Sequence, residues 1–290
     1  MTWHLTPHVD EFRRAAAAYL EADPAGCTTL LTVTETVRRH GLRPDGDDDD
    51  DALFGWWRRS PGGPVEAAFL HTPPAYPMLG PMPEEAAHEL ARTLRRRPRV
   101  HGVRGGDGAA RAFADAWTAA GEAPGAWTVA RRTRLFRLGT LTPPHPAAPG
   151  RARRATPDDV PFAAAWMQRF AADIGEDAAA DYTRNVTRRV AHGGLYVWES
   201  GDRPVSMAAH SPLVAGQSRV SPVYTPPEQR GRGYAGAVTT AVARAAQAAG
   251  ARHVLLFADL ANPTSNALYQ RLGFRPLADH LDITFNQLSR

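Results

Sequence analysis

The residues best suited to chemistry lie in a turn rich in glycine and arginine. The turn follows a predicted strand over 219–225 and precedes a predicted helix over 235–249, whose apolar residues recur every three or four positions. Gly231 and Gly233 let the backbone approach a ligand without intervening Cβ atoms. The first N–H groups of the helix lack intrahelical partners and carry partial positive charge. Two arginines add full charges, Arg230 and Arg232. The combination predicts a binding site for a pyrophosphate group.

The same turn also fits a dinucleotide-binding pattern. The P-loop string G-x-x-x-x-G-K-[ST] does not occur, but Gly231, Gly233 and Gly236 match G-x-G-x-x-G. That pattern requires an acidic residue at the end of the next strand, and Asp259 ends a predicted strand over 253–258. The local pattern alone therefore leaves an NAD(P)H-dependent reductase as an alternative.

Two segments resemble signatures of the GCN5-related N-acetyltransferase (GNAT) superfamily. Residues 230–235 fit [Q/R]-x-x-G-x-[G/A], and residues 262–274 resemble N-x-x-[S/A]-x-x-x-Y-x-x-x-G-F. The order of predicted elements over 153–213 follows the same family. A dinucleotide-binding fold would need more parallel strands after Phe257, whereas the chain ends at Arg290. We therefore favour acyl-CoA over NAD as the ligand.

The resemblance implies an acyl-CoA-dependent N-acyltransferase with acetyl-CoA as co-substrate, in which an amine attacks the thioester directly. In the family, the turn binds the pyrophosphate and the strand before it contacts pantetheine. The resemblance places Tyr269 near the sulfur as the general acid, and the backbone N–H of Val223, freed by a bulge, at the oxyanion. Pro222 has no N–H, which is consistent with broken pairing there. The expected cofactor-binding residues are Val223, Thr225, Arg230, Gly231, Arg232, Gly233, Tyr234, Ala235, Asn262 and Ser265.

The helix that carries Tyr269 has clear boundary signals. Asn262 suits the N-cap, Pro263 the first helical position, and Gly273 the C-terminal cap. Tyr269 follows Asn262 by nearly two turns, so the two side chains lie on about the same face. The alternative is that Tyr269 is half-buried with its hydroxyl bonded to the backbone.

Acyl transfer also needs a neutral amine. An amine of pKa ~10.4 is neutral in about 1 part in 2,500 at pH 7, a penalty of roughly 4–5 kcal/mol, so a base or a desolvating site is required. His210 ends a predicted strand and titrates near neutrality, which makes it the candidate base; the alternative is a strand-end residue facing water. Glu199 and Glu228 are the other titratable groups near the predicted central strands. Without a base, the turn would suit a non-catalytic acyl-CoA-binding sensor or scaffold.

Length and composition suggest two domains with packed cores. The chain has 290 residues, of which 43% are hydrophobic. Cys27 is its only cysteine, so we expect neither a disulfide framework nor a cysteine-based metal site, and no metal is predicted. The run of aspartates at 47–51 predicts a surface loop.

The expected partner is a small-molecule or peptide amine acceptor whose identity is not encoded in any pattern. The net charge is only +4 and the arginines are scattered, so no nucleic-acid partner is expected. No apolar run approaches 18 residues and the N-terminus lacks a signal sequence, so we expect no membrane association and a cytoplasmic location. The expected assembly is a monomer or homodimer.

A proline-rich linker at 141–152 separates predicted domains over 1–140 and 153–290. Predicted elements recur in the same order in both, which indicates a tandem of GNAT-like α/β domains, each a mixed, largely antiparallel sheet flanked by helices. The turn at 78–83 has one glycine and no charge, so we expect the first copy to be degenerate and the second catalytic. The alternative is an unrelated α+β domain. The main predicted elements are helices over 9–20, 84–96, 109–120 and 178–191, and strand pairs at 53–57 with 65–70 and 195–198 with 205–209. Residues 156–159 predict a capping box at the start of a further helix.

Overall fold

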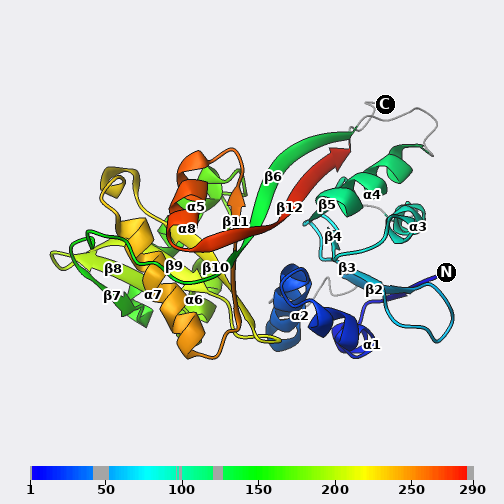
Figure 1. Ribbon diagram of the computed structural model, residues 1–290, viewed down its shortest axis with the longest axis horizontal. Coiled ribbons are helices and arrows are strands. Elements are labelled where there is room, and N and C mark those ends of the chain that lie inside the picture. The colour runs from blue at the N-terminus through cyan, green and yellow to red at the C-terminus, as the bar shows by residue number, and fades with distance from the viewer. Residues whose placement is uncertain (1, 42–51, 96, 98–99, 120–126, 286–290) are drawn as a thin grey trace. The chain divides into compact units, whose positions relative to one another are not determined.

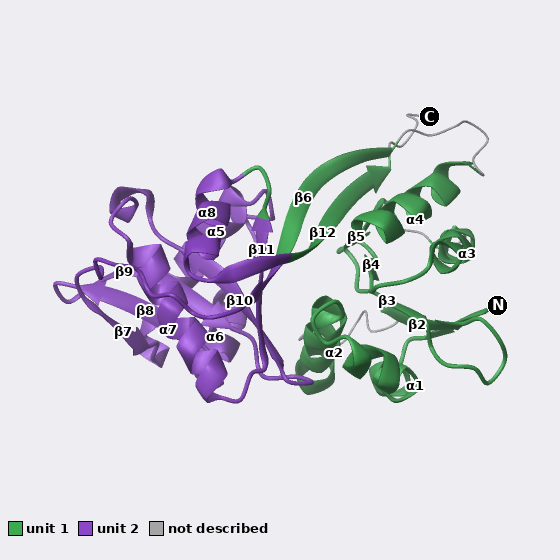
Figure 2. Ribbon diagram, viewed as in Figure 1, with its two compact units in different colours: residues 1–135, 259–261, 277–290 green, residues 136–258, 262–276 purple. Residues whose placement is uncertain are grey.

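The computed structural model of this chain describes residues 2–41, 52–95, 97, 100–119 and 127–285 (Figure 1). The chain forms two compact units (Figure 2). Unit 1 contains Met1–Leu135, Asp259–Ala261 and Leu277–Arg290, and unit 2 contains Phe136–Ala258 and Asn262–Pro276. The aspartate run at 47–51 lies outside the described residues.

Unit 1 is a sheet with helices packed against it. Its elements are β1 (Thr2–Thr6), α1 (Val9–Ala22), α2 (Thr28–His40), β2 (Leu53–Arg58), β3 (Ala67–His71), β4 (Met78–Leu79), α3 (Glu84–Leu94), β5 (Gly102–Gly106), α4 (Asp107–Ala119) and β6 (Trp127–Leu138), which continues into unit 2. The strand order is β1-β2-β3-β4-β5-β12-β6, in which β12 (Phe274–Phe285) comes from the end of the chain. The predicted antiparallel pair is confirmed as β2 with β3, and β4 pairs in parallel with β5.

The core of unit 1 depends on β12, a strand that the sequence analysis did not predict. β12 pairs antiparallel with β5, from His280↔Gly106 to Thr284↔Gly102. Its apolar side chains join the buried cluster formed by α3, α4 and the sheet. Arg104 donates two hydrogen bonds to the Asp282 carboxylate, from Nε at 2.7 Å and from Nη2 at 2.8 Å. Residues from the end of the chain therefore complete the middle of the unit 1 sheet.

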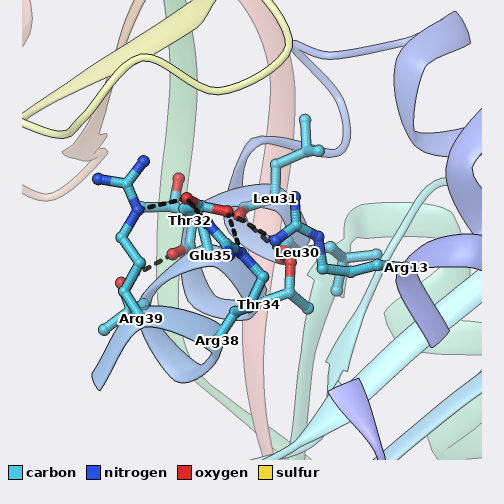
Figure 3. A network of polar contacts seen from close by, with 9 residues as sticks. Arg13, Leu30, Leu31, Thr32, Thr34, Glu35, Arg38 and Arg39 are labelled. Carbon is cyan, nitrogen blue, oxygen red and sulfur yellow. Dashed lines mark hydrogen bonds and ion pairs between the residues drawn. The ribbon is translucent and has the colours of Figure 1, made fainter. Parts of the chain in front are cut away.

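A buried carboxylate connects α1 and α2 (Figure 3). Glu35 accepts hydrogen bonds from Arg38 Nη2 at 2.9 Å, from Arg13 Nη1 at 2.7 Å, and from Arg39. The hydrogen bond from Arg38 is the largest cause that lowers the pKa of Glu35, and burial acts in the opposite direction. Arg39 and Arg13 lower the pKa further, to about 2. Glu35 is therefore an anion across the neutral pH range, and its three partners satisfy the charge that burial would otherwise disfavour.

Unit 2 contains the other strands of the 12-stranded sheet, with its own helices. Its elements are β7 (Arg151–Arg154), α5 (Val160–Asp173), α6 (Thr183–Ala191), β8 (Leu195–Ser200), β9 (Arg203–His210), β10 (Gln217–Tyr224), α7 (Tyr234–Ala248), β11 (His253–Asp259) and α8 (Pro263–Arg271). The strand order is β11-β10-β9-β8-β7; β10 and β11 are parallel, and the other neighbours are antiparallel. The predicted α/β class, with a mixed, largely antiparallel sheet flanked by helices, is confirmed.

Two predicted helix starts in unit 2 are confirmed by their hydrogen bonds. The Asn262 side chain accepts from the Ser265 N–H at 3.0 Å, which caps α8. Gly273 follows α8 with φ of +96°, the left-handed region that suits glycine after a helix. Before α5, Thr156 and Asp159 form the predicted capping box, with the Thr156 N–H donating to Asp159 at 2.7 Å.

The helix predicted over 178–191 is shorter than expected, since α6 begins only at Thr183. The carboxylate of Asp177 accepts from the Ala179 N–H at 2.8 Å, and that of Asp181 accepts from the Thr183 N–H at 2.8 Å. Such local side-chain bonds stabilise turns at the expense of helix. The alanine-rich stretch between the two aspartates therefore remains outside the helix.

Candidate functional site

β10 is irregular where the sequence analysis predicts a bulge. It pairs with β9 at Val220↔His210 and next at Val223↔Ala208, with a shift in register between them. Three steps along β10 thus oppose two along β9, which is a one-residue bulge. Pro222 lies inside this interval and has no N–H to donate. The interruption of pairing before Val223 is confirmed, while the role of the Val223 N–H stays a prediction.

The parallel pairing of β10 with β11 is short. It joins Gln217, Ser218 and Arg219 to His253, Val254 and Leu255. β10 then continues to Tyr224 and β11 to Asp259, with no further pair of this ladder among the described residues. The carboxyl-terminal halves of β10 and β11 are therefore not paired with each other. Strand backbone that is left unpaired in this way can bind an extended ligand.

The turn between β10 and α7 has the backbone form that its glycines predict. Gly231 and Gly233 have φ of +77° and +80°, in the left-handed region that side chains rarely adopt. A Cβ atom on Gly231 would meet no atom within 4 Å, so the space beside the turn is open. Within the described part of the chain, the main-chain N–H groups of residues 231–236 donate to no acceptor. An exposed set of donors therefore lies at the start of α7.

The two arginines of the turn differ in their surroundings. Arg230 Nε donates to the Thr225 carbonyl oxygen at 3.0 Å, and its Nη2 donates to the Asp173 carboxylate at 2.6 Å. Arg230 therefore links the turn to the end of α5, a role that its predicted phosphate contact did not include. Arg232 is exposed and bonds to none of the described residues, so its charge is available to a ligand.

The other predicted contacts around the turn have partners inside the protein. The Thr225 hydroxyl is buried, 2.8 Å from the Ser206 hydroxyl. Tyr234 is also buried, and its hydroxyl donates to Ser200 Oγ at 3.3 Å. Ala235 is the half-buried second residue of α7. These side chains shape the turn, so a ligand would contact their backbone more readily than their side chains.

Tyr269 lies in the apolar cluster against which Val223 packs, so the two predicted catalytic positions come together. Its side chain is buried, and its ring meets Phe274 edge-to-face with centroids 6.1 Å apart. The hydroxyl bonds to no described residue, so the alternative of a backbone-bonded tyrosine is wrong. Burial raises the pKa of Tyr269 to about 12, so the hydroxyl keeps its proton across the physiological range.

His210 ends β9, as predicted, and is half-buried. Its Nδ1 lies 3.0 Å from the Ser211 carbonyl oxygen, an arrangement that assigns the proton to Nδ1 and leaves Nε2 as an acceptor. Burial lowers the pKa of His210; the Ser211 contact opposes this, and the positive charge of Arg154 lowers it further. Its ring lies 6.4 Å from that of Tyr196, which packs against the cluster containing Tyr269.

The two other titratable candidates are less suited to act as a base. Glu199 accepts a hydrogen bond from Arg153 Nε at 2.5 Å, so its carboxylate is held in an ion pair. Glu228 is exposed in the short 3-10 turn Pro227–Gln229.

Sequence reasoning missed one cation at this site. Arg189 of α6 donates from Nη1 to the Ser221 carbonyl oxygen at 2.5 Å, inside the irregular part of β10. No motif marked it, because its neighbourhood arises only from the packing of α6 on the sheet.

The turn at 78–83 in unit 1 differs from the turn of unit 2 in two ways. A Cβ atom on Gly80 would lie 2.5 Å from Tyr19 Oη and 2.9 Å from Leu30 Cδ1, so the space beside it is filled. The first turn of α3 carries Glu84 and Glu85, and negative charge at a helix N-terminus repels an anionic ligand.

Other classes of site are not evident in the described ranges. No group of three or more His, Cys, Asp or Glu side chains in them is placed to hold a metal ion. No helix in the same part of the chain is long and apolar enough to cross a membrane. Cys27 is buried, which raises its pKa to about 12 and keeps it a thiol.

Comparison with known proteins finds a family model that matches less than half of the chain, and solved structures with a similar fold over nearly all of it. Residues 160–274 match the model of the acetyltransferase (GNAT) family. This range contains the open turn, the irregular β10 and Tyr269. No curated protein matches the chain in sequence.

Several solved structures match nearly the whole chain, among them the following three. A GNAT-family acetyltransferase from Colwellia psychrerythraea is 11% identical, with a TM-score of 0.59 over 98% of this chain and 99% of its own. A Drosophila protein is 14% identical, with a TM-score of 0.68 and 98% of each chain covered. A GCN5-related N-acetyltransferase from Sphaerobacter thermophilus is 16% identical, with a TM-score of 0.62 over 98% of this chain and 95% of its own. The matches show that this fold recurs over the full length of other chains.

Proposed function

We propose that unit 2 binds an acyl-CoA, with acetyl-CoA as the donor, and transfers its acyl group to an amine that attacks the thioester directly. The match of residues 160–274 to the GNAT family supports acyl transfer. The observation that carries the proposal is the open turn at Gly231, where unpaired N–H groups follow a strand that has left its parallel neighbour. Donors of this kind at a helix N-terminus suit a pyrophosphate.

The roles of the other residues follow from their surroundings. The backbone N–H of Val223, after the bulge, would stabilise the oxyanion, and the Tyr269 hydroxyl, predicted as the general acid, would donate a hydrogen bond to the departing thiolate. His210 would take the proton from the amine through Nε2, because its lowered pKa keeps it neutral at pH 7. Arg232 would pair with the phosphates, and Arg230 would hold the turn in shape.

We also propose that unit 1 is a degenerate second copy that binds no pyrophosphate. The filled space beside Gly80 and the acidic first turn of α3 support this, since each would exclude such a ligand. The nearly full-length matches to other chains are consistent with a tandem arrangement. The proposed domains are 1–140 and 153–290 with a linker at 141–152, and residues 259–261 and 277–290 of the second domain lie within compact unit 1.

A pair of matched glycine variants tests the proposal. Gly231 and Gly62 have φ of +77° and +74°, and an added Cβ meets no atom within 4 Å at either. Gly231→Ala and Gly62→Ala therefore introduce similar backbone strain, of roughly 1–2 kcal/mol, without a clash. We expect calorimetry to show acetyl-CoA binding at least about 10-fold weaker for Gly231→Ala and unchanged for Gly62→Ala. Equal affinity in both variants would remove the turn from the binding site.

Thiol release separates an enzyme from an acyl-CoA sensor. The unbonded Tyr269 hydroxyl and the neutral His210 favour catalysis, because a sensor requires neither. We expect free thiol to accumulate when acetyl-CoA and an amine are added together. Binding of acetyl-CoA without thiol release across a broad panel of amines would instead support the sensor.

A further inference from the structure

Arg189 is a cation held by neutral groups beside the irregular part of β10. Its Nε donates to the Asn185 side-chain oxygen at 2.8 Å, and its Nη1 donates to the Ser221 carbonyl oxygen at 2.5 Å. Ser221 lies between Val220 and Val223, where the register with β9 shifts. A positive charge is therefore fixed next to the stretch at which we propose that the thioester reacts.

Arg189 has no carboxylate partner in the part of the chain that the structure describes. Among the described residues, no Asp or Glu side chain forms an ion pair with Arg189, Arg188 or Arg184. The carboxylates of unit 2 that do form ion pairs bind other arginines: Asp159 and Glu199 bind Arg153, and Asp173 binds Arg230. A charge that is half-buried and held only by neutral oxygens is incompletely compensated.

Further arginines lie close enough to repel Arg189. Burial lowers its pKa most, the charges of Arg219 and Arg188 lower it further, and the resulting pKa is about 10. Arg184 acts on Arg188 in the same way. Arg219 also lies over the Phe257 ring, 6.0 Å from its centroid. We call three of these residues the α6 arginine cluster: Arg184, Arg188 and Arg189. None of the three forms an ion pair with a described carboxylate, so at pH 7 the cluster is a local excess of positive charge.

We propose that the acceptor amine carries a carboxylate, which Arg189 binds from within the α6 arginine cluster. This rests on the proposed function, because it assigns a substrate class to the same site. A guanidinium presents several donors in one plane, which fit a carboxylate. The cluster would repel a second ammonium group, so diamines and polyamines are excluded. It would also disfavour the ammonium form of the acceptor nitrogen, which favours the neutral amine that attacks.

The test compares amines of equal length that differ only at the far end. Straight-chain ω-amino acids, alkylamines and diamines of two to six carbons are assayed by thiol release from acetyl-CoA at constant ionic strength. We expect kcat/KM to be about 10- to 100-fold higher for the preferred amino acid than for its alkylamine, as one charged hydrogen-bonded contact allows. Arg189→Gln removes that difference. Arg244→Gln, which removes an exposed charge from α7, preserves it.

A thermal-melt assay with coenzyme A bound tests, without turnover, whether Arg189 binds the carboxylate of the acceptor. The ω-amino acid is expected to raise the melting temperature of the wild type and of Arg189→Lys, and to have no effect on Arg189→Gln. A melting shift without thiol release would support the anion site and refute catalysis. Equal turnover of amino acids and alkylamines, preference for diamines, or a melting shift that survives Arg189→Gln would overturn the proposal.

Discussion

At the scale of single residues, Tyr269 acts chiefly as a hydrogen-bond donor. An ordinary thiol has a pKa of about 8.5, whereas burial raises that of Tyr269 to about 12. Complete proton transfer from the tyrosine to a thiolate would therefore be uphill by roughly 5 kcal/mol. Stabilising the developing negative charge through a hydrogen bond requires no such transfer. The predicted general acid is thus better described as a donor that remains protonated.

Replacing Tyr269 by phenylalanine tests this role. We expect kcat to fall by on the order of 100-fold, the usual effect of losing one donor to a developing anion, with little change in acetyl-CoA affinity. Activity should show no loss from tyrosine ionisation up to about pH 11, because the pKa of Tyr269 is raised to about 12. A fall in affinity that matches the fall in kcat would show that the hydroxyl serves binding alone.

The lowered pKa of His210 predicts how activity depends on pH. Burial places its pKa below the ordinary 6.5, so the imidazole is a base at neutral pH and becomes inactive as the pH falls through that lowered pKa. We expect kcat/KM of the wild type to rise with pH through a midpoint below 6.5, and this limb to vanish in His210→Gln. If the acidic limb persists in the variant, another group is the base.

At the scale of elements, the turn and its flanking strand were predictable because glycine, proline and cap residues act locally. Asn262, Gly273 and the capping box at Thr156 all appear where the sequence placed them. α2 was missed because its threonine-rich sequence favours strand by propensity. In the structure, hydroxyls satisfy carbonyls one turn earlier, as Thr32 donates to the Thr28 carbonyl oxygen at 2.6 Å, and burial of the helix overrides propensity.

The cap of α8 gives an element-scale prediction. Asn262→Ala removes the acceptor for the Ser265 N–H and should lower the free energy of unfolding by about 1 kcal/mol. Asn262→Asp retains an acceptor and should remain close to the wild type. Urea denaturation of both variants measures the difference. Equal stability of the alanine and aspartate variants would mean that the cap does not stabilise α8.

At the scale of the whole molecule, long-range strand placement was beyond the sequence analysis. β12 has no strong alternation, and its partners in β5 lie far earlier in the chain. Arg104 and Asp282, which pair across these strands, are separated by 178 positions, so no local pattern could connect them. For the same reason Arg189 was not predicted at β10, although each element alone was largely located.

The dependence of unit 1 on β12 is testable with a fragment. Residues 1–135 lack the strand that lies between β5 and β6, so we expect no cooperative urea transition for this fragment followed by circular dichroism. Addition of a peptide of residues 274–290 in excess should restore a transition. A fragment that unfolds cooperatively by itself would show that unit 1 does not need the end of the chain.

The most direct test of the central claim compares coenzyme A with pantetheine in the same calorimetric titration of the wild type. Both carry the thiol arm, but only coenzyme A carries the pyrophosphate that the N–H groups of the turn after Arg230 are proposed to bind. We predict that pantetheine binds at least about 100-fold more weakly, since it loses several charge-assisted hydrogen bonds at once. Similar affinities for the two molecules would contradict the account.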